Sequence, residues 1–272
     1  MRLAFAFLAL ISLAVPARAQ MRDNLDTELN CNDGNRDRPR VCEVHETRLG
    51  PSGTLELEPG HNGGITVKGW SQNSVLVRAR LEAWAENDSE ARALASQVRI
   101  DTAAGRIRAT GPDFNGSQGW WGQDRRWSVS LEVFTPWNTD LRAGSHNGGL
   151  TFSDIRGRIN FQSHNGGVRL TRVAGDINGE THNGGIQVEL DGATYQGRQL
   201  EVSTHNGGIT LSLPASFSAS FETRTNSGRL DSDFPVNVRG RLDERQLNFS
   251  IGSGGPLIKV TTHNGGIRLR RM

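Results

Sequence analysis

Most histidines of this 272-residue chain belong to one short motif, and histidine is the residue best suited to acid–base or metal chemistry near neutral pH. The tetrapeptide His-Asn-Gly-Gly contains six of the seven histidines. Its copies span 61–64, 146–149, 164–167, 182–185, 205–208 and 263–266, and a degenerate copy, Thr-Asn-Ser-Gly, spans 225–228.

Three copies follow one another at intervals of 18 residues, which predicts a column of imidazoles formed by His146, His164 and His182. Neutral imidazoles about 5 Å apart could chelate zinc or copper ions, or they could repel one another once protonated. Alternatively, each imidazole forms a hydrogen bond with its own turn, because three ring nitrogens on a line are poorly placed for tetrahedral coordination. The three histidines stand as a metal-site hypothesis, and no cofactor is assigned.

The sequence contains none of the short motifs that mark common catalytic sites. Gly-x-Ser-x-Gly, His-Glu-x-x-His and the glycine-rich phosphate loop are all absent. An acidic cluster could suggest the carboxylate pair of a polysaccharide lyase or hydrolase; its members are Asp231, Asp233, Asp243 and Glu244. Carboxylates in a charged sequence also lie this close by chance, so the sequence predicts that the protein is not an enzyme.

A tryptophan-rich segment is the second candidate for binding. Four of the six tryptophans lie between residues 113 and 137, and a long loop is predicted over 113–127. Within it, Trp120 and Trp121 either cover an open end of the fold or form an aromatic platform for sugar rings or a protein partner. Trp127 and Trp137 lie in or beside strand patterns and are expected in the core.

The motif copies are followed by strand patterns. The residue after each complete copy is apolar, and apolar and polar residues then alternate. These apolar positions are Ile65, Leu150, Val168, Ile186, Ile209 and Ile267. In the tandem copies a second turn signal follows, and a second strand leads back to the next copy, as at 159–162 and 200–203. Each period of about 20 residues is therefore strand, turn, strand, turn, which is typical of a repeat architecture.

Repeated turns favour an all-β β-solenoid or β-helix with one short helix. Asn-Gly is also a strong hairpin signal, so an antiparallel β-sandwich or meander is the alternative. The solenoid explains why one turn repeats letter for letter, because equivalent turns then lie ~4.8 Å apart and their asparagines can form a hydrogen-bonded ladder. The glycines are expected to give the corner a left-handed backbone. The structural turn residues are Asn62, Gly63, Gly64, Asn147, Gly148, Gly149, Asn165, Gly166, Gly167, Asn183, Gly184, Gly185, Asn206, Gly207, Gly208, Asn264, Gly265 and Gly266.

The segment Val-Phe-Thr-Pro-Trp-Asn-Thr-Asp-Leu at 133–141, followed by repeated Asn-Gly-Gly-apolar units, resembles the bacterial putative-adhesin family. The resemblance covers 130–215 and 255–270 and is looser over 43–110. It implies an exported β-helix-like domain of unknown function. Two features depart from the family pattern: Arg229 stands where an apolar residue is expected, and a turn is missing near 243–246.

The first residues have the composition of a secretory signal. Arg2 precedes an apolar run of 13 residues over 3–15, and Ala17 and Ala19 are the small residues that signal peptidase requires. A run this short cannot cross about 30 Å of hydrocarbon. Cleavage between Ala19 and Gln20 is therefore expected, with the mature protein in the periplasm or outside the cell.

The chain divides into a signal peptide over 1–19, a polar leader over 20–42 and a single β-solenoid domain over 43–272. In an oxidising compartment, Cys31 and Cys42 are expected to form a disulfide that staples the leader and stabilises it by roughly 2–4 kcal/mol.

One helix is expected within the domain, over Glu86–Val98. Asn87 or Asp88 would cap its N-terminus. Its apolar residues at helical spacing are Ala91, Leu94, Ala95 and Val98. This stripe is expected to face the core rather than to bind a partner.

Composition argues against a nucleic-acid binder. The net charge is +2 at pH 7, and removing residues 1–19 with their two arginines leaves equal numbers of basic and acidic side chains. Such a chain has no global field that would hold nucleic acid or an anionic membrane. The mature chain is also expected to lack an integral membrane segment.

These observations predict a non-enzymatic exported bacterial protein, either adhesin-like or structural, associated with the cell envelope. Its partner would be an envelope polymer, a glycan or another protein. The alternative is a periplasmic carbohydrate-binding or carbohydrate-active protein, or a partner in envelope-stress sensing.

Overall fold

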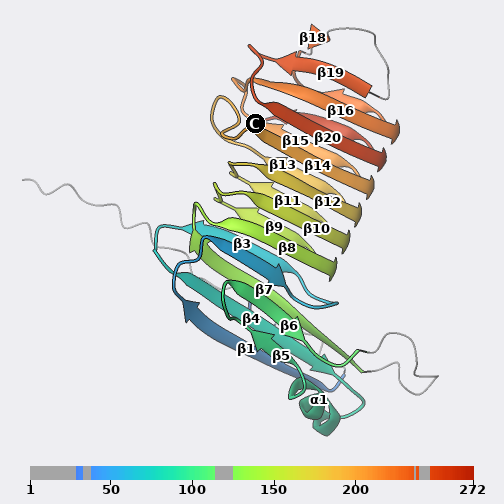
Figure 1. Cartoon of the computed structure of the whole chain (residues 1–272). Coiled ribbons are helices and arrows are strands. Elements are labelled where there is room, and N and C mark those ends of the chain that lie inside the picture. The colour runs from blue at the N-terminus through green and yellow to red at the C-terminus, as the bar shows by residue number, and fades with distance from the viewer. Residues whose placement is uncertain (1–28, 33–37, 114–124, 236, 239–245) are drawn as a thin grey trace, which may run out of the picture.

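The computed structural model describes residues 29–32, 38–113, 125–235, 237–238 and 246–272, which form two long β-sheets with the apolar core between them (Figure 1). The prediction of an all-β solenoid with one short helix is confirmed. The predicted signal peptide, its cleavage site, and the residues Trp120, Trp121, Asp243 and Glu244 lie outside the described residues.

We call the ten-stranded sheet "sheet 1" and the eleven-stranded sheet "sheet 2". In spatial order, sheet 1 consists of β1 (Arg40–Leu49), β4 (Val75–Trp84), β7 (Arg126–Pro136), β3 (Ile65–Trp70), β9 (Leu150–Ser153), β11 (Val168–Thr171), β13 (Ile186–Glu189), β15 (Ile209–Leu213), β21 (Ile267–Arg271) and β17 (Leu230–Ser232). Sheet 2 consists of β18 (Asn237–Val238), β19 (Gln246–Ile251), β16 (Ala219–Ser227), β20 (Leu257–Asn264), β14 (Gln199–Asn206), β12 (Ile177–Asn183), β10 (Ile159–Asn165), β8 (Asp140–Asn147), β2 (Thr54–Glu58), β6 (Arg106–Thr110) and β5 (Arg99–Asp101).

Each coil consists of one strand of sheet 2, a corner made by the repeated motif, and one strand of sheet 1. The strand of sheet 1 begins at the apolar residue after the motif, so that Leu150 pairs with Val168 and Val168 with Ile186, all in parallel. Because side chains alternate across a strand, every second residue of each strand points between the sheets. The aligned rows are fully buried, as Phe152 and Leu170 illustrate.

The antiparallel meander is wrong for the repeated region, since its described strands pair in parallel. Antiparallel pairing occurs at the two ends of the stack instead. At one end β1 pairs with β4, β4 with β7, and β5 with β6. At the other end β16 pairs with β19, and β19 with β18. Among the described strands, antiparallel pairing is therefore confined to the two ends of the stack.

The order of coils in space differs from their order in the chain. The C-terminal coil, β20 and β21, lies between the coil of β14 and β15 and the coil of β16 and β17. The degenerate motif copy at 225–228 therefore belongs to the last coil, beyond the copy at 263–266 (Figure 1). The sequence interval of 38 residues before the last copy suggests a lost coil in between, but β19, which lies within that interval, runs antiparallel beside β16.

The helix α1 (Asp88–Ala95) is shorter than the predicted range and lies at the end of the stack opposite the last coil (Figure 1). Oδ1 of Asn87 accepts a hydrogen bond of 2.9 Å from the backbone N–H of Glu90, which identifies Asn87 as the cap. The buried face of the helix is Ala91, Leu94 and Ala95, while Val98 packs against the core after the helix has ended. Among the described residues, no helix is long and apolar enough to span a membrane.

The predicted disulfide is confirmed: Cys31 and Cys42 are bonded, with 5.8 Å between their Cα atoms. Strand β1 begins at Arg40, so regular structure reaches into the predicted leader. Two arginines fix the start of the described chain, because Arg40 donates to the carbonyl of Cys31 and Arg80 to that of Asn30, both over 2.9 Å. The described residues 29–32 of the leader are thus attached to sheet 1.

The two described tryptophans of the tryptophan-rich segment behave differently. Trp127 is buried and its indole N–H donates to the carbonyl of Pro112 over 2.8 Å. Trp137 is 39% exposed and lies under the guanidinium of Arg156, 5.5 Å from its carbon to the ring centroid. The expectation that both lie in the core is therefore wrong for Trp137, which follows the end of β7 and points to solvent.

Candidate functional site

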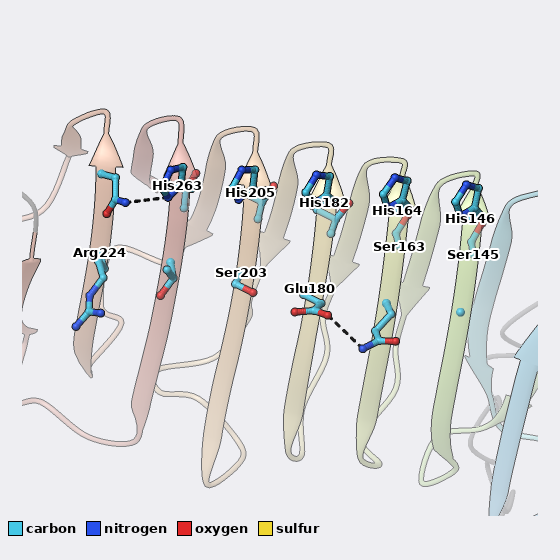
Figure 2. A pocket seen from close by; sticks show the side chains of 17 residues that line it. Ser145, His146, Ser163, His164, Glu180, His182, Ser203, His205, Arg224 and His263 are labelled. Carbon is cyan, nitrogen blue, oxygen red and sulfur yellow. Dashed lines mark hydrogen bonds between the residues drawn. The ribbon is translucent and has the colours of Figure 1, made fainter.

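Six imidazole rings form one continuous column along the corners of the solenoid. Neighbouring ring centroids lie 4.2–5.0 Å apart, in the order His61, His146, His164, His182, His205 and His263. The five rings from His146 onward are parallel to within 6° (Figure 2). His146, His164 and His182 lie in the column that their spacing predicts. Stacking fixes the ring planes, so the rings present their edges to solvent.

The asparagines of the motif form a hydrogen-bonded ladder beside the imidazoles. Nδ2 of each asparagine donates to Oδ1 of the asparagine in the preceding coil over 2.8–2.9 Å. The ladder runs through Asn62, Asn147, Asn165, Asn183, Asn206 and Asn264. An interior amide therefore has a partner on each side, which stabilises the register of the coils.

A row of hydroxyl groups completes the corner, and the sequence analysis missed it. The residue before each histidine from His146 onward is a buried serine or threonine whose hydroxyl donates to the carbonyl of the first glycine in the preceding coil. For example, the hydroxyl of Thr204 donates to the carbonyl oxygen of Gly184 over 2.8 Å. The signal is present in the sequence, since a hydroxyl residue precedes five of the six complete copies.

The motif glycines are required by close packing between coils. A Cβ atom at Gly166 would lie 2.1 Å from the carbonyl oxygen of Gly148, a distance that real Cβ atoms do not adopt. The second glycine is less confined, since a Cβ at Gly167 would lie 3.4 Å from the carbonyl oxygen of Gly185. Among the glycines of the six complete copies only Gly63 has a positive φ, so the expectation of left-handed corners is wrong.

The degenerate copy is shifted by one residue from its predicted alignment. Ser227 pairs with Asn264, and Leu230 pairs with Ile267. Arg229 therefore occupies the position of the second glycine rather than the apolar position, which Leu230 fills. The apparent departure from the family pattern at Arg229 was an error of alignment, because a single degenerate turn contains too few matching letters to fix its register.

The last coil also ends the histidine column. Asn226 stands at the histidine position of this coil, and its Nδ2 lies 2.8 Å from Nδ1 of His263 (Figure 2). The amide therefore replaces a seventh ring with a hydrogen bond. Within the described residues, His263 is the one ring of the column whose nitrogen is engaged by another side chain.

A long open groove runs along sheet 2 beside the histidine column. Its volume is about 810 Å³, and a second hollow of about 500 Å³ continues it across the sheet. Figure 2 shows the histidines along one rim, with Glu180, Ser203 and Arg224 lower on the same face. The residues shared by both hollows are Gly144, Gln162, Glu180 and Ser203. The groove crosses successive coils, so its long axis follows the stack.

The groove is polar, and acidic side chains outnumber basic ones. Its charged lining residues are Glu56, Glu58, Glu180, Glu201, Arg142 and Arg224. Nζ of Lys259 lies 2.8 Å from Oε1 of Glu201, and that hydrogen bond and charge raise the pKa of Lys259. Gln162 donates to Glu180 over 3.2 Å. Between these charges lie amides and hydroxyls, which suit a ligand rich in hydroxyl groups.

The stacked imidazoles do not converge on a point. Parallel rings hold their nitrogen lone pairs parallel, and a spacing of 4.7–5.0 Å between His146, His164 and His182 leaves neighbouring nitrogens too far apart to share an ion at zinc–nitrogen distances of about 2.0–2.1 Å. Among the described residues, no group of three or more His, Cys, Asp and Glu side chains is arranged to hold a metal ion.

The acidic cluster is also arranged for structure. Asp231 and Asp233 both accept hydrogen bonds from the guanidinium of Arg270, over 3.2 and 3.1 Å. Elsewhere the guanidinium of Arg198 lowers the pKa of Asp176 through a side-chain hydrogen bond. These carboxylates are engaged in ion pairs at the surface, and neither pair faces the groove.

Comparison with known protein families decides where this chain belongs. The model of the Toastrack DUF4097 family matches residues 61–270, which include every copy of the repeated motif. The chain belongs to this family. The resemblance to a putative-adhesin family of unknown function that the sequence suggests is thereby confirmed. No curated protein matches this Toastrack chain by sequence.

Several solved structures are similar to this Toastrack protein. A putative cell adhesion protein from Clostridium sporogenes has 13% identity and a TM-score of 0.44, with 85% of this chain and 100% of that chain covered. A putative adhesin from Bacteroides fragilis has 10% identity and a TM-score of 0.35, with coverages of 85% and 97%. A putative lipid-binding protein from Parabacteroides distasonis has 8% identity and a TM-score of 0.27, with coverages of 84% and 96%.

Proposed function

We propose that this Toastrack protein is an exported, non-enzymatic, adhesin-like module that binds a polymer of the bacterial cell envelope along the groove of sheet 2. The observation that carries this proposal is the groove itself, which follows the histidine column across successive coils. A ligand that contacts every coil must be long and narrow, as a polymer is. The disulfide between Cys31 and Cys42 supports export, because such bonds persist in oxidising compartments.

The arrangement of the side chains favours binding over catalysis. The groove repeats an imidazole at five successive coils, whereas a catalytic centre needs a few different groups that converge on one reacting bond. The names of similar structures, two of which are described as adhesion proteins, agree with this proposal. Trp120 and Trp121 remain a second proposed contact surface for the same polymer.

Cosedimentation with bacterial envelope material tests the proposal. The mature chain, Gln20–Met272, should sediment with the envelope fraction and release no soluble fragments from it over hours. The variant Gln162→Ala/Ser203→Ala, which changes the floor of the groove, should lose most of this binding while its thermal unfolding is unchanged. A matched control, Gln187→Ala/Thr210→Ala, changes two paired outward residues of sheet 1 and should bind like the parent.

Unchanged sedimentation of the groove variant would contradict the proposal. Steady release of soluble sugar fragments would instead support the alternative of a carbohydrate-active enzyme.

A further inference from the structure

The lining of the groove indicates the chemical class of the polymer, an inference that rests on the proposed function. We propose that the groove binds a linear, uncharged polysaccharide whose chain runs along the stack of coils. The sugar hydroxyls would form hydrogen bonds with the imidazole edges and with the amides and hydroxyls of sheet 2.

Between its two ends, the imidazole column offers ring edges rather than ring faces. Neighbouring rings cover one another at 4.2–5.0 Å, and at one end Nδ2 of Asn226 contacts the edge of His263. The ring nitrogens of His146, His164, His182 and His205 form no hydrogen bond with the described protein. Each neutral ring has one nitrogen that donates and one that accepts, and a sugar hydroxyl does both. Along its length the column therefore suits hydroxyl groups, because its rings already stack on one another and present their edges.

The charges in the groove disfavour a polyanion. Four glutamates and two arginines line the two hollows, and three of the glutamates are already ion-paired, with Arg106, Arg108 and Lys259. The guanidinium of Arg224 already donates to Gln246 over 2.8 Å. The charges of the described lining therefore nearly cancel and form no row of cations, so a polymer with an acidic group in every unit would lose its hydration without gaining a paired cation at each unit. An uncharged chain avoids this cost.

The floor of the groove supplies uncharged polar groups on β10, β12, β14 and β20. The uncharged residues of sheet 2 that point outward into the groove include Asn160, Gln162, Asn178, Ser203 and Thr261. Gly144 leaves open space in the same row, since a Cβ there would meet nothing within 4 Å. Amides and hydroxyls can donate and accept, so they complement sugar hydroxyls in several orientations.

The repeat predicts how affinity depends on chain length. Each coil contributes one imidazole and the polar groups beside it, and the stacked rings are already ordered before binding. Contacts at successive coils are made by one chain, so each additional sugar adds a tethered contact rather than a separate binding event. Affinity should therefore rise with oligomer length until the groove is filled and then level off.

Calorimetric titration of the mature chain with three neutral oligosaccharide series tests the inference. The series are chito-, cello- and manno-oligosaccharides from dimer to hexamer, and oligogalacturonates of the same lengths are the polyanionic arm. At least one neutral series should bind, and its hexamer should bind about tenfold or more tightly than its dimer. Gln162→Ala/Ser203→Ala should weaken the hexamer about tenfold, whereas Gln187→Ala/Thr210→Ala on sheet 1 should leave it unchanged.

The outcomes separate this inference from the proposed function. If oligogalacturonates bind more tightly than every neutral series, or if no neutral series binds, the inference is wrong even though groove-dependent sedimentation with envelope material still stands. Affinity that does not change with length also overturns it. If the groove variant sediments with the envelope like the parent chain, the proposed function itself fails.

Discussion

The interior corners of the solenoid and the corner of its last coil have the same backbone path but different sequences. Interior corners contain histidine, asparagine and two glycines, whereas the last corner contains Asn226, Ser227, Gly228 and Arg229. An interior corner has neighbours on both sides, and among the described residues the last corner has one only on the side of the C-terminal coil. The residues that differ identify which positions each neighbour requires.

The first glycine and the hydroxyl residue, which face the preceding coil, keep their types in the last corner. Gly228 remains glycine, because a Cβ there would lie 1.9 Å from the carbonyl oxygen of Gly265. Thr225 remains a hydroxyl residue and donates to that same carbonyl over 2.9 Å. The second glycine faces the following coil, as at Gly266, and is replaced by Arg229 in the last coil that the structure describes.

The largest effect expected from this comparison concerns the first glycine of an interior corner. Gly166→Ala places a Cβ against the carbonyl of Gly148 and should destabilise the fold by about 3 kcal/mol or more, since neither backbone can move without breaking the stack. Gly167→Ala should cost about 1 kcal/mol, because its Cβ is only slightly crowded. Urea denaturation measures both, with Gly144→Ala as the unhindered control, expected within about 0.5 kcal/mol of the parent. Equal losses for Gly166 and Gly167 would contradict the packing argument.

The same test in the last coil sharpens the comparison. Gly228→Ala should cost about 2 kcal/mol, less than an interior first glycine because a terminal coil can relax outward. Arg229→Ala should change the stability by under about 0.5 kcal/mol, because no following coil of the described chain packs on that position. The denaturation midpoints of the two variants measure this difference in stability. A larger loss at Arg229 than at Gly228 would show that the last corner is held by something other than its preceding neighbour.

The asparagine ladder should show the same dependence on neighbours. Asn183→Ala removes one bond to Asn165 and one from Asn206, which should cost between about 1 and 2 kcal/mol. Asn264→Ala removes the bond to Asn206, while its other neighbour is Ser227, so it should cost about half as much. Thermal unfolding of the two variants provides the comparison, and equal costs would contradict a ladder of pairwise bonds.

A smaller effect is expected from the hydroxyl row. Thr204→Val keeps the shape of the buried side chain and removes its bond to the carbonyl of Gly184, so it should cost about 1 kcal/mol. Thr210→Val, on the outward face of sheet 1, is the matched control and should cost nothing measurable. If both variants unfold at the same temperature, the hydroxyl row contributes little to the stability of the fold, which would contradict this prediction.

The sequence predicts the repeated parts of this molecule well and its irregular parts poorly. The strands after each motif, the column of His146, His164 and His182 and the confirmed disulfide follow from period, alternation and compartment. The order of the last two coils does not, because a parallel neighbour of either coil offers the same hydrogen bonds and the same apolar rows. The register of the degenerate turn follows from the pairing of Ser227 with Asn264, and the spacing of the motif copies does not predict that pairing.

The reason for the glycines was also beyond the sequence. Asn-Gly suggests a left-handed turn by itself, but the close approach of Gly166 to Gly148 is a contact between two coils. The groove was missed for a similar reason, since its residues have unremarkable types and gather only when the strands stack. A row of serine and threonine before the histidines was visible in the sequence, and it was the one missed signal that needed no structure.

The central claim is that the residues of one motif have two roles. Asparagine and glycine stabilise the contacts between coils, and we propose that histidine binds the polymer in the groove. The most direct test measures envelope binding and thermal unfolding of one variant, His164→Ala/His182→Ala, on the same preparation. The account predicts that binding falls at least about tenfold while the melting temperature falls by only a few degrees, because exposed stacked rings contribute under about 1 kcal/mol each. Full binding by a variant as destabilised as Gly166→Ala would contradict it.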